Sequence, residues 1–95
     1  MEPGYNLTAD AIAELDLEAD KTARAALERE PGGLAGMVTV ALEAVFQTAG
    51  ADLAAYLLPG ENGSMLLRRR ALAKAYRRII AEEIERRELE RRGER

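Results

Sequence analysis

Two residue types that carry much of enzyme chemistry are missing from this chain of 95 residues, which contains neither histidine nor cysteine. Histidine is the commonest general base and the commonest metal ligand, and the cysteine thiolate is a strong nucleophile. Without cysteine the chain also forms no disulfide. Any chemistry must therefore rest on carboxylates, hydroxyls and amines, which need special surroundings to react at neutral pH.

Three carboxylates, Asp10, Glu14 and Glu18, recur at every fourth position and share one face of a predicted helix. We call this set the acidic ridge. Paired carboxylates can perform acid–base catalysis or bind a metal, but helical two-metal sites combine glutamate with histidine. Because the chain has no histidine, we expect the acidic ridge to be a solvated strip or a surface that faces a partner.

The remaining candidates for a nucleophile are hydroxyl groups and lysine. Ser64 and Thr8 stand where hydroxyls cap the first turn of predicted helices, and no base accompanies them. Lys74 falls on the outer face of a predicted helix, where its amine stays solvated. We therefore expect no catalytic residue, no metal or cofactor site and no small-molecule substrate, so the chain is not expected to be an enzyme.

The composition predicts helices as the elements that position these groups. The chain holds 18 alanines and 13 leucines but only four aromatic residues. Alanine and leucine favour helices, whereas aromatic and β-branched residues favour strands. A chain of this length has room for one core. We expect an all-α fold, a single small bundle-like domain of three or four helices.

Apolar residues at steps of three and four predict three helical segments, at about 8–29, 34–58 and 64–91, after a lead-in over residues 1–7. The first segment begins with Thr8 as its N-cap and ends before the turn at 31–33. The second is apolar nearly all round, which is typical of a central, buried helix, and a break at Gly50 is the alternative to one continuous helix. The third carries a long, charged end beyond the core.

Neither a membrane span nor secretion is expected. The second segment is long enough to span a membrane, but Glu43, Gln47 and Asp52 would then lie in hydrocarbon, which is unfavourable. The N-terminus lacks the basic and apolar stretches of a secretory signal. We therefore expect an intracellular protein, cytoplasmic or virion-associated.

The charges of the chain are unevenly distributed. Residues 1–63 carry a net charge of −8, and residues 64–95 carry a net charge of +5. Residues 68–78 include six cations and no acid. Four of these cations fall within about 100° of arc on a helical wheel, opposite the apolar stripe. We call them the basic cluster, and they are Arg70, Lys74, Arg77 and Arg78.

Four interpretations of the basic cluster are open. The first is a solvated surface whose charge the acidic first helix neutralises, and the second is a docking face for an acidic protein surface such as a second copy. The third is a phosphate-binding face for nucleic acid, and the fourth is a membrane-binding face. The net charge of −3 disfavours general nucleic-acid binding. Arg69 lies within the apolar stripe, so either its stem packs while its head reaches solvent, or it anchors an interface.

These features together favour binding over catalysis. An alanine-rich core buries little area per residue, so a monomer of this kind has a small margin of stability. We expect a non-catalytic protein–protein interaction or assembly subunit, or an adaptor, that forms a homo-oligomer or belongs to a larger, virion-like complex. The alternatives are a nucleic-acid-binding accessory protein or regulator that uses the basic cluster, and a small inhibitor whose acidic ridge acts as a decoy. Partner contacts are expected at both charged sets and at Arg69.

Overall fold

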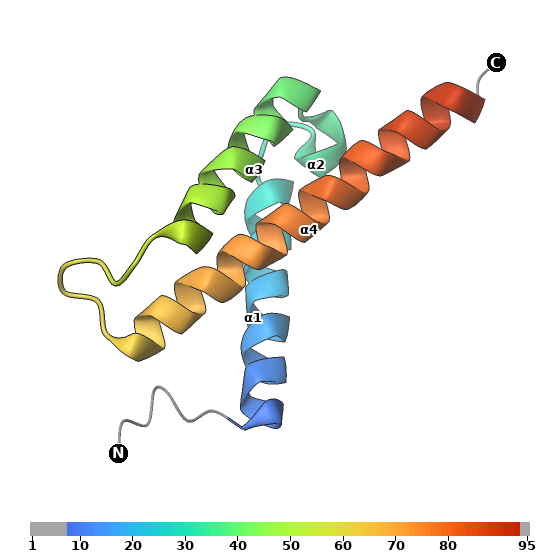
Figure 1. Ribbon diagram of the computed structural model, residues 1–95. Helices are drawn as coiled ribbons and strands as arrows, with labels where there is room; N and C mark the ends of the chain where they lie inside the picture. The colour runs from blue at the N-terminus through green and yellow to red at the C-terminus, as the bar shows by residue number, and fades with distance from the viewer. Residues whose placement is uncertain (1–7, 94–95) are drawn as a thin grey trace.

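The computed structural model describes residues 8–93, and it contains no strand in that range. Figure 1 shows four helices in this part of the chain. They are α1 (Ala9–Glu28), α2 (Gly33–Gly36), α3 (Thr39–Ala54) and α4 (Gly63–Gly93). The predictions of an all-α fold and of a long C-terminal helix are confirmed. The lead-in expected over residues 1–7 lies outside the described residues.

The central element is α4, because α1 and α3 both pack against it, from different sides (Figure 1). One buried cluster joins three residues of α1 to three of α4: Ala19, Ala23, Leu27, Ala71, Ala75 and Ile79. Ala73 and Ile80 are also buried and lie on the opposite face of α4, toward α3. The prediction that the 34–58 segment forms the central helix is therefore wrong.

Small residues on two faces of α4 explain its central position. Helices approach closely where small side chains face the neighbour. Ala71 and Ala75 form one such face, and Ala73 lies about 200° around the helix from Ala71. By contrast, α3 buries only Leu42 and Ala49. Its remaining apolar side chains are half-buried or exposed, although its sequence is the most apolar of the chain.

The core is small and the fold is open. Six of the ten buried hydrophobic residues are alanines. The radius of gyration is 15.6 Å, whereas a compact chain of this length has a value of about 12 Å. Large apolar side chains that remain exposed are Ile12, Leu17, Val38, Val40, Tyr56, Leu57, Leu58, Met65 and Leu89. The fold therefore leaves much apolar surface without a neighbour.

The segment expected over residues 34–58 is not one helix. It divides at Met37 and Val38, whose backbone is extended, into the single turn α2 and the helix α3. A β-carbon on Gly36 would lie 2.9 Å from a backbone carbonyl oxygen of the preceding turn, so glycine permits the tight corner here. The alternative break at Gly50 does not occur, because α3 is continuous through that residue.

An arginine of α4 holds the corner between α2 and α3. Arg87 donates to the carbonyl oxygens of Leu34 and Ala35 at 3.2 and 3.4 Å, and to the hydroxyl of Thr39 at 3.2 Å. Both carbonyl groups lie at the end of a helical turn, where few backbone donors remain, and that of Leu34 also accepts the N–H of Met37 at 3.2 Å. Glu83, which is buried, pairs with Arg87 at 2.8 Å and keeps its guanidinium in place.

The helix α3 ends at Ala54, four residues earlier than expected. Residues 55–58 are not helical: the backbone of Ala55 is already extended, and Pro59 disfavours the helical conformation at Leu58. The carbonyl group of Asp52, at the end of α3, accepts a hydrogen bond of 2.6 Å from Arg69 of α4. Both ends of α3 are thus fastened to α4 by arginine side chains.

The predicted cap of α1 is confirmed, because the hydroxyl of Thr8 accepts a hydrogen bond of 3.1 Å from the N–H of Ala11. The predicted cap of α4 at Ser64 is wrong. Instead, the side-chain oxygen of Asn62 accepts a hydrogen bond of 2.9 Å from the N–H of Met65. The helix α4 therefore begins at Gly63, one residue before the expected start at 64. Asn62 takes this role because asparagine is among the most favourable N-cap residues.

The last turns of α4 project beyond the core, as expected (Figure 1). Arg86 pairs there with Glu83 at 2.7 Å and with Glu90 at 2.5 Å. The Arg86–Glu90 pair is exposed on both sides, and such a pair contributes only a few tenths of a kcal/mol. Among the helices of residues 8–93, none combines the length and the apolar character that crossing a membrane requires.

Candidate protein-binding site

Two members of the basic cluster, Arg70 and Arg77, lie against α3 and not on an outer face. The guanidinium of Arg77 lies over the ring of Phe46, 4.4 Å from its centroid, in a cation–π contact. Arg70 donates to the carbonyl oxygen of Ala55 at 3.4 Å. The Nε atoms of both arginines are buried and have no hydrogen-bond partner in the described part of the chain. These two cations therefore serve contacts inside the fold.

The other two members of the basic cluster point elsewhere. Arg78 forms an ion pair with Asp20 of α1, and Asp20 also pairs with Arg24 at 2.9 Å. The hydrogen bond from Arg24, together with the charges of both arginines, lowers the pKa of Asp20. Lys74 is exposed. The basic cluster does not form one open cationic face, because α4 has packed partners on two sides.

Arg69 is neither a side chain that reaches solvent nor an exposed anchor. Its guanidinium pairs with the carboxylate of Glu61, with an Nε–Oε2 distance of 2.9 Å. It also donates to the carbonyl oxygens of Asp52 at 2.6 Å and Tyr56 at 3.0 Å. The side chains of Arg69 and Glu61 are only 16% and 9% exposed. We call this pair the loop clamp, because it fastens the loop between α3 and α4 to α4.

Glu61 is the residue of this site that the sequence did not indicate. Its carboxylate also accepts the N–H of Leu58 at 3.0 Å, which closes the loop on itself. The hydrogen bond from Arg69, followed by that from Leu58, lowers the pKa of Glu61 from 4.5 to about 2. A single acid in a turn, eight residues before its arginine, does not match any helical spacing.

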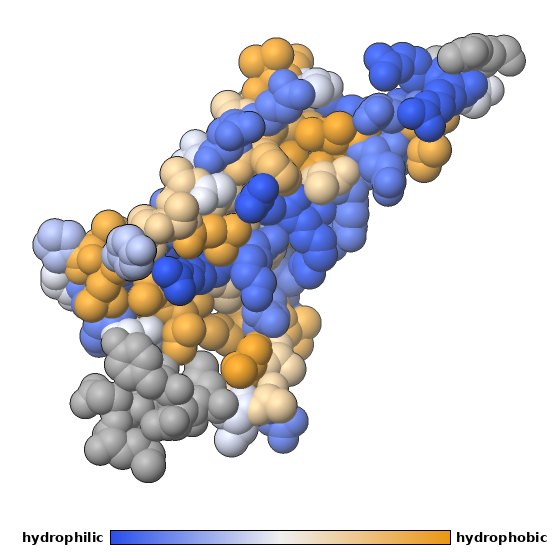
Figure 2. Space-filling model, in the orientation of Figure 1, coloured by the Kyte–Doolittle hydropathy of each residue, from blue (hydrophilic) through white to orange (hydrophobic). Residues whose placement is uncertain are grey.

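The loop clamp holds three apolar side chains in solvent. Tyr56 is 85% exposed, and Leu57 and Leu58 are each 48% exposed. In Figure 2, orange side chains gather at the left edge, where Figure 1 places the loop between α3 and α4. We call these three residues the apolar loop. Burial of a large apolar side chain contributes about 1.5–3 kcal/mol, so the apolar loop is a candidate contact surface.

Protonation of Glu61 is expected to release the apolar loop in acid. The folded pKa of about 2 lies below the ordinary 4.5, so the stabilisation by the loop clamp is complete above pH 4.5 and is lost as the pH falls toward 2. An NMR titration of the Leu58 amide is expected to show this transition, and Glu61→Gln is expected to remove it. A midpoint at 4.5 would contradict the pairing with Arg69.

Replacing Arg69 with alanine is expected to release the apolar loop at neutral pH. The change removes the ion pair with Glu61 and both bonds to carbonyl oxygens. Hydrogen exchange of the Leu58 amide is expected to accelerate by at least about tenfold. Arg68→Ala is the matched control, because Arg68 is the exposed neighbour and forms no hydrogen bond within residues 8–93. Equal exchange rates in the two variants would contradict the loop clamp.

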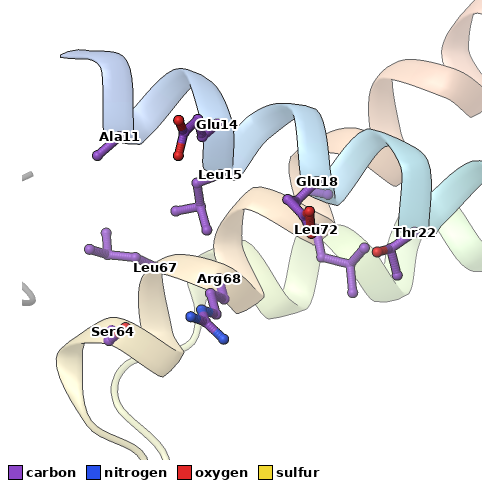
Figure 3. A pocket seen from close by; sticks show the side chains of 10 residues that line it. Ala11, Glu14, Leu15, Glu18, Thr22, Ser64, Leu67, Arg68 and Leu72 are labelled. Carbon is purple, nitrogen blue, oxygen red and sulfur yellow. The ribbon is translucent and has the colours of Figure 1, made fainter. Parts of the chain in front are cut away.

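Part of the acidic ridge lines an open groove between α1 and α4. Glu14 and Glu18 of α1 line it together with Arg68 of α4, as Figure 3 shows, whereas Asp10 is exposed and does not line it. The groove has a volume of about 530 Å³. We call it the α1–α4 groove. Its charged rims thus bring together two predicted acidic residues and one arginine that the sequence did not single out.

The described residues offer little for metal chemistry. Within residues 8–93, no three acidic side chains are arranged to hold a metal ion. Comparisons with known proteins give no match, whether to a protein-family model, to a curated protein or to a solved structure. A function must therefore be inferred from the contacts and exposed surfaces of the described residues.

Proposed function

We propose that this chain is a non-catalytic assembly subunit that binds another protein through the apolar loop. The observation that carries the proposal is the loop clamp, which fixes a loop whose apolar side chains are left in solvent. Three neighbouring apolar side chains that are held in solvent offer area that a partner can bury. The partner is another protein of the intracellular or virion-like complex to which we assign this chain.

The physical reason lies in how interfaces gain affinity. Tyrosine is enriched among the residues that dominate binding at protein interfaces, and Tyr56 is the most exposed large side chain of the loop. Leu57 and Leu58 add apolar area beside it. Binding orders side chains and loops, at a cost of about 0.5–1.5 kcal/mol for each ordered side chain. Because Arg69 and Glu61 already fix the loop, much of this cost is absent when the partner binds.

The two alternatives draw less support from the same contacts. Phosphate binding needs several free cations on one face, and Arg70, Arg77 and Arg78 are engaged within the fold. A decoy needs a uniformly acidic surface, but Glu14 shares its groove with Arg68.

Photo-crosslinking in the cells that produce the chain tests the proposal. A photoreactive amino acid in place of Tyr56 is expected to give a discrete adduct with a protein, and the same amino acid in place of the exposed Glu82 of α4 is expected to give none. Adding Arg69→Ala to the Tyr56 variant is expected to lower the adduct yield severalfold, because the loop is then no longer fixed. The same adducts from both positions would contradict the proposal.

A further inference from the structure

A second groove, with a volume of about 740 Å³, runs between α3 and α4, which pack side by side (Figure 1). Its apolar lining consists of Val40, Ala44 and Phe46 of α3 and of Ala81 and Ile84 of α4. Val40 is 74% exposed, Ala44 and Ala81 are also exposed, and Phe46 and Ile84 are half-buried. None of the five belongs to the buried cluster between α1 and α4 or packs against it. We call this the α3–α4 groove, and its apolar area is left in solvent by the fold.

The rim of the α3–α4 groove is acidic. Glu43 of α3 and both Glu85 and Glu88 of α4 line it, and the described lining includes neither lysine nor arginine. None of the three glutamates forms an ion pair with another described residue. An adjoining hollow adds Arg87 and Arg91, but Arg87 is already held at the corner between α2 and α3. The carboxylates of the rim are therefore in excess.

We propose that the α3–α4 groove binds a basic amphipathic helix of another protein. The apolar stripe of that helix packs against Val40 and Ile84, and its flanking lysines and arginines pair with the rim carboxylates. A helix in an apolar groove is a common mode of recognition, and rim charges of opposite sign speed association and fix the orientation of the partner.

This site goes beyond the proposed function, because it is separate from the apolar loop. The groove includes Val40, near the start of α3, whereas the apolar loop follows the end of that helix. The helix has 16 residues and is about 24 Å long. The chain would then hold one protein at each end of α3.

The charge of the rim selects against other occupants. The phosphates of a nucleic acid and the carboxylates of an acidic protein would meet like charges there. A second copy of this chain carries its basic stretch at residues 68–78, where Arg70 and Arg77 contact α3 and Arg78 pairs with α1. Its turns beyond Ile84 mix acids with arginines. A basic helix from a different protein is therefore the complementary partner.

A peptide probe tests the groove directly. The probe is a helical peptide of about 18 residues, or five turns, with leucines at steps of three and four and lysines on both flanks. In NMR titrations of the full chain it is expected to shift the methyl signals of Val40, Ala44 and Ile84. A matched peptide with glutamate in place of every lysine is expected to leave them unchanged. Shifts confined to other residues would overturn the inference.

Charge reversal separates groove binding from a general attraction between a basic peptide and an acidic chain. Glu43→Lys with Glu85→Lys is expected to raise the dissociation constant of the lysine probe at least about tenfold. The matched control, Glu14→Lys with Glu18→Lys, changes the net charge equally on the acidic ridge, and less than about a threefold change is expected. Equal losses in the two double variants would contradict a site at the groove.

A pair of valines tests the apolar half of the contact. Val40→Ser is expected to weaken binding of the lysine probe severalfold, because Val40 lines the groove. Val38→Ser is the control, because Val38 is 67% exposed but is not part of the lining. Equal effects of the two changes would count against apolar packing in the groove.

Further controls separate this test from folding and from the proposed function. Circular dichroism should show unchanged helix content in every variant. A wild-type dimer that Glu43→Lys with Glu85→Lys dissociates in sedimentation would assign the groove to a second copy and overturn the inference. The Tyr56 adduct does not depend on the groove, so a probe that fails to bind beside an intact adduct removes this inference and leaves the proposed function.

Discussion

Replacing Ile80 with alanine is expected to lower the free energy of unfolding by about 2–5 kcal/mol. Ile80 is one of the three largest fully buried side chains, and it lies on the face of α4 that meets α3. Removing most of this side chain leaves a cavity, because two helices that are fastened at both ends cannot close the gap. A native domain has only about 5–15 kcal/mol of stability in total, so this variant is expected to lose a large share of it.

Urea unfolding followed by circular dichroism measures this loss. The control is Leu89→Ala, a change on the same helix at a side chain that is 58% exposed, for which a change within about 0.5 kcal/mol is expected. If Ile80→Ala unfolds at the same urea concentration as the unchanged chain, then α3 does not pack on α4 as described.

Replacing Ala23 with leucine is expected to destabilise the chain by about 1–3 kcal/mol, through overpacking. Ala23 is completely buried where α1 crosses α4, in the cluster with Ala71 and Ala75. The small side chains set the separation of the two helices, and a leucine can fit only if α1 moves away. Because α1 packs mainly on α4, such a movement weakens most of the contacts of α1.

The same leucine on the exposed side of α1 is the control. Ala25→Leu adds identical volume at an exposed position of the same helix, so little change in urea stability is expected. NMR contacts between the side chains of Leu27 and Ile79 report whether α1 has moved. Equal stability of both leucine variants would contradict the close crossing at Ala23.

Local features of this fold could be predicted from the sequence because they depend on neighbouring residues. The cap at Thr8 needs only a hydroxyl before a helical segment, and the turn before α4 needs only its proline and glycines. The charged end of α4 follows because Leu89 is the one large apolar residue after Ile84 and is surrounded by charged residues. Such signals fix where helices start and stop to within a few residues.

The choice of central helix could not be read from hydropathy. The 34–58 segment is the most apolar, yet it lies to one side, because α4 presents alanines on two faces. The spacing of Ala71, Ala73 and Ala75 was available as a signal, since alternate residues on a helix lie on nearly opposite sides. That packing also turned Arg70 and Arg77 toward α3, so the predicted open basic face is absent.

The loop clamp depends on contacts between distant parts of the chain. Arg69 bonds to Asp52 and Tyr56, which lie 17 and 13 residues away in sequence. No periodic pattern in the sequence predicts such a contact. The only feature that pointed to a special role for Arg69 was its position within the apolar stripe of the helix. The acidic ridge was partly predicted, because Glu14 and Glu18 do border a groove, although their neighbour Arg68 became visible only in the fold.

The central claim is that another protein chain covers the apolar surface that this fold leaves open. Photo-crosslinking from position 56 in the cells that produce the chain tests it most directly. We predict a discrete adduct heavier than the 10.4 kDa of one chain, in a yield that falls severalfold when Arg69→Ala releases the apolar loop. No adduct from position 56, or the same adducts from positions 56 and 82, would contradict the account.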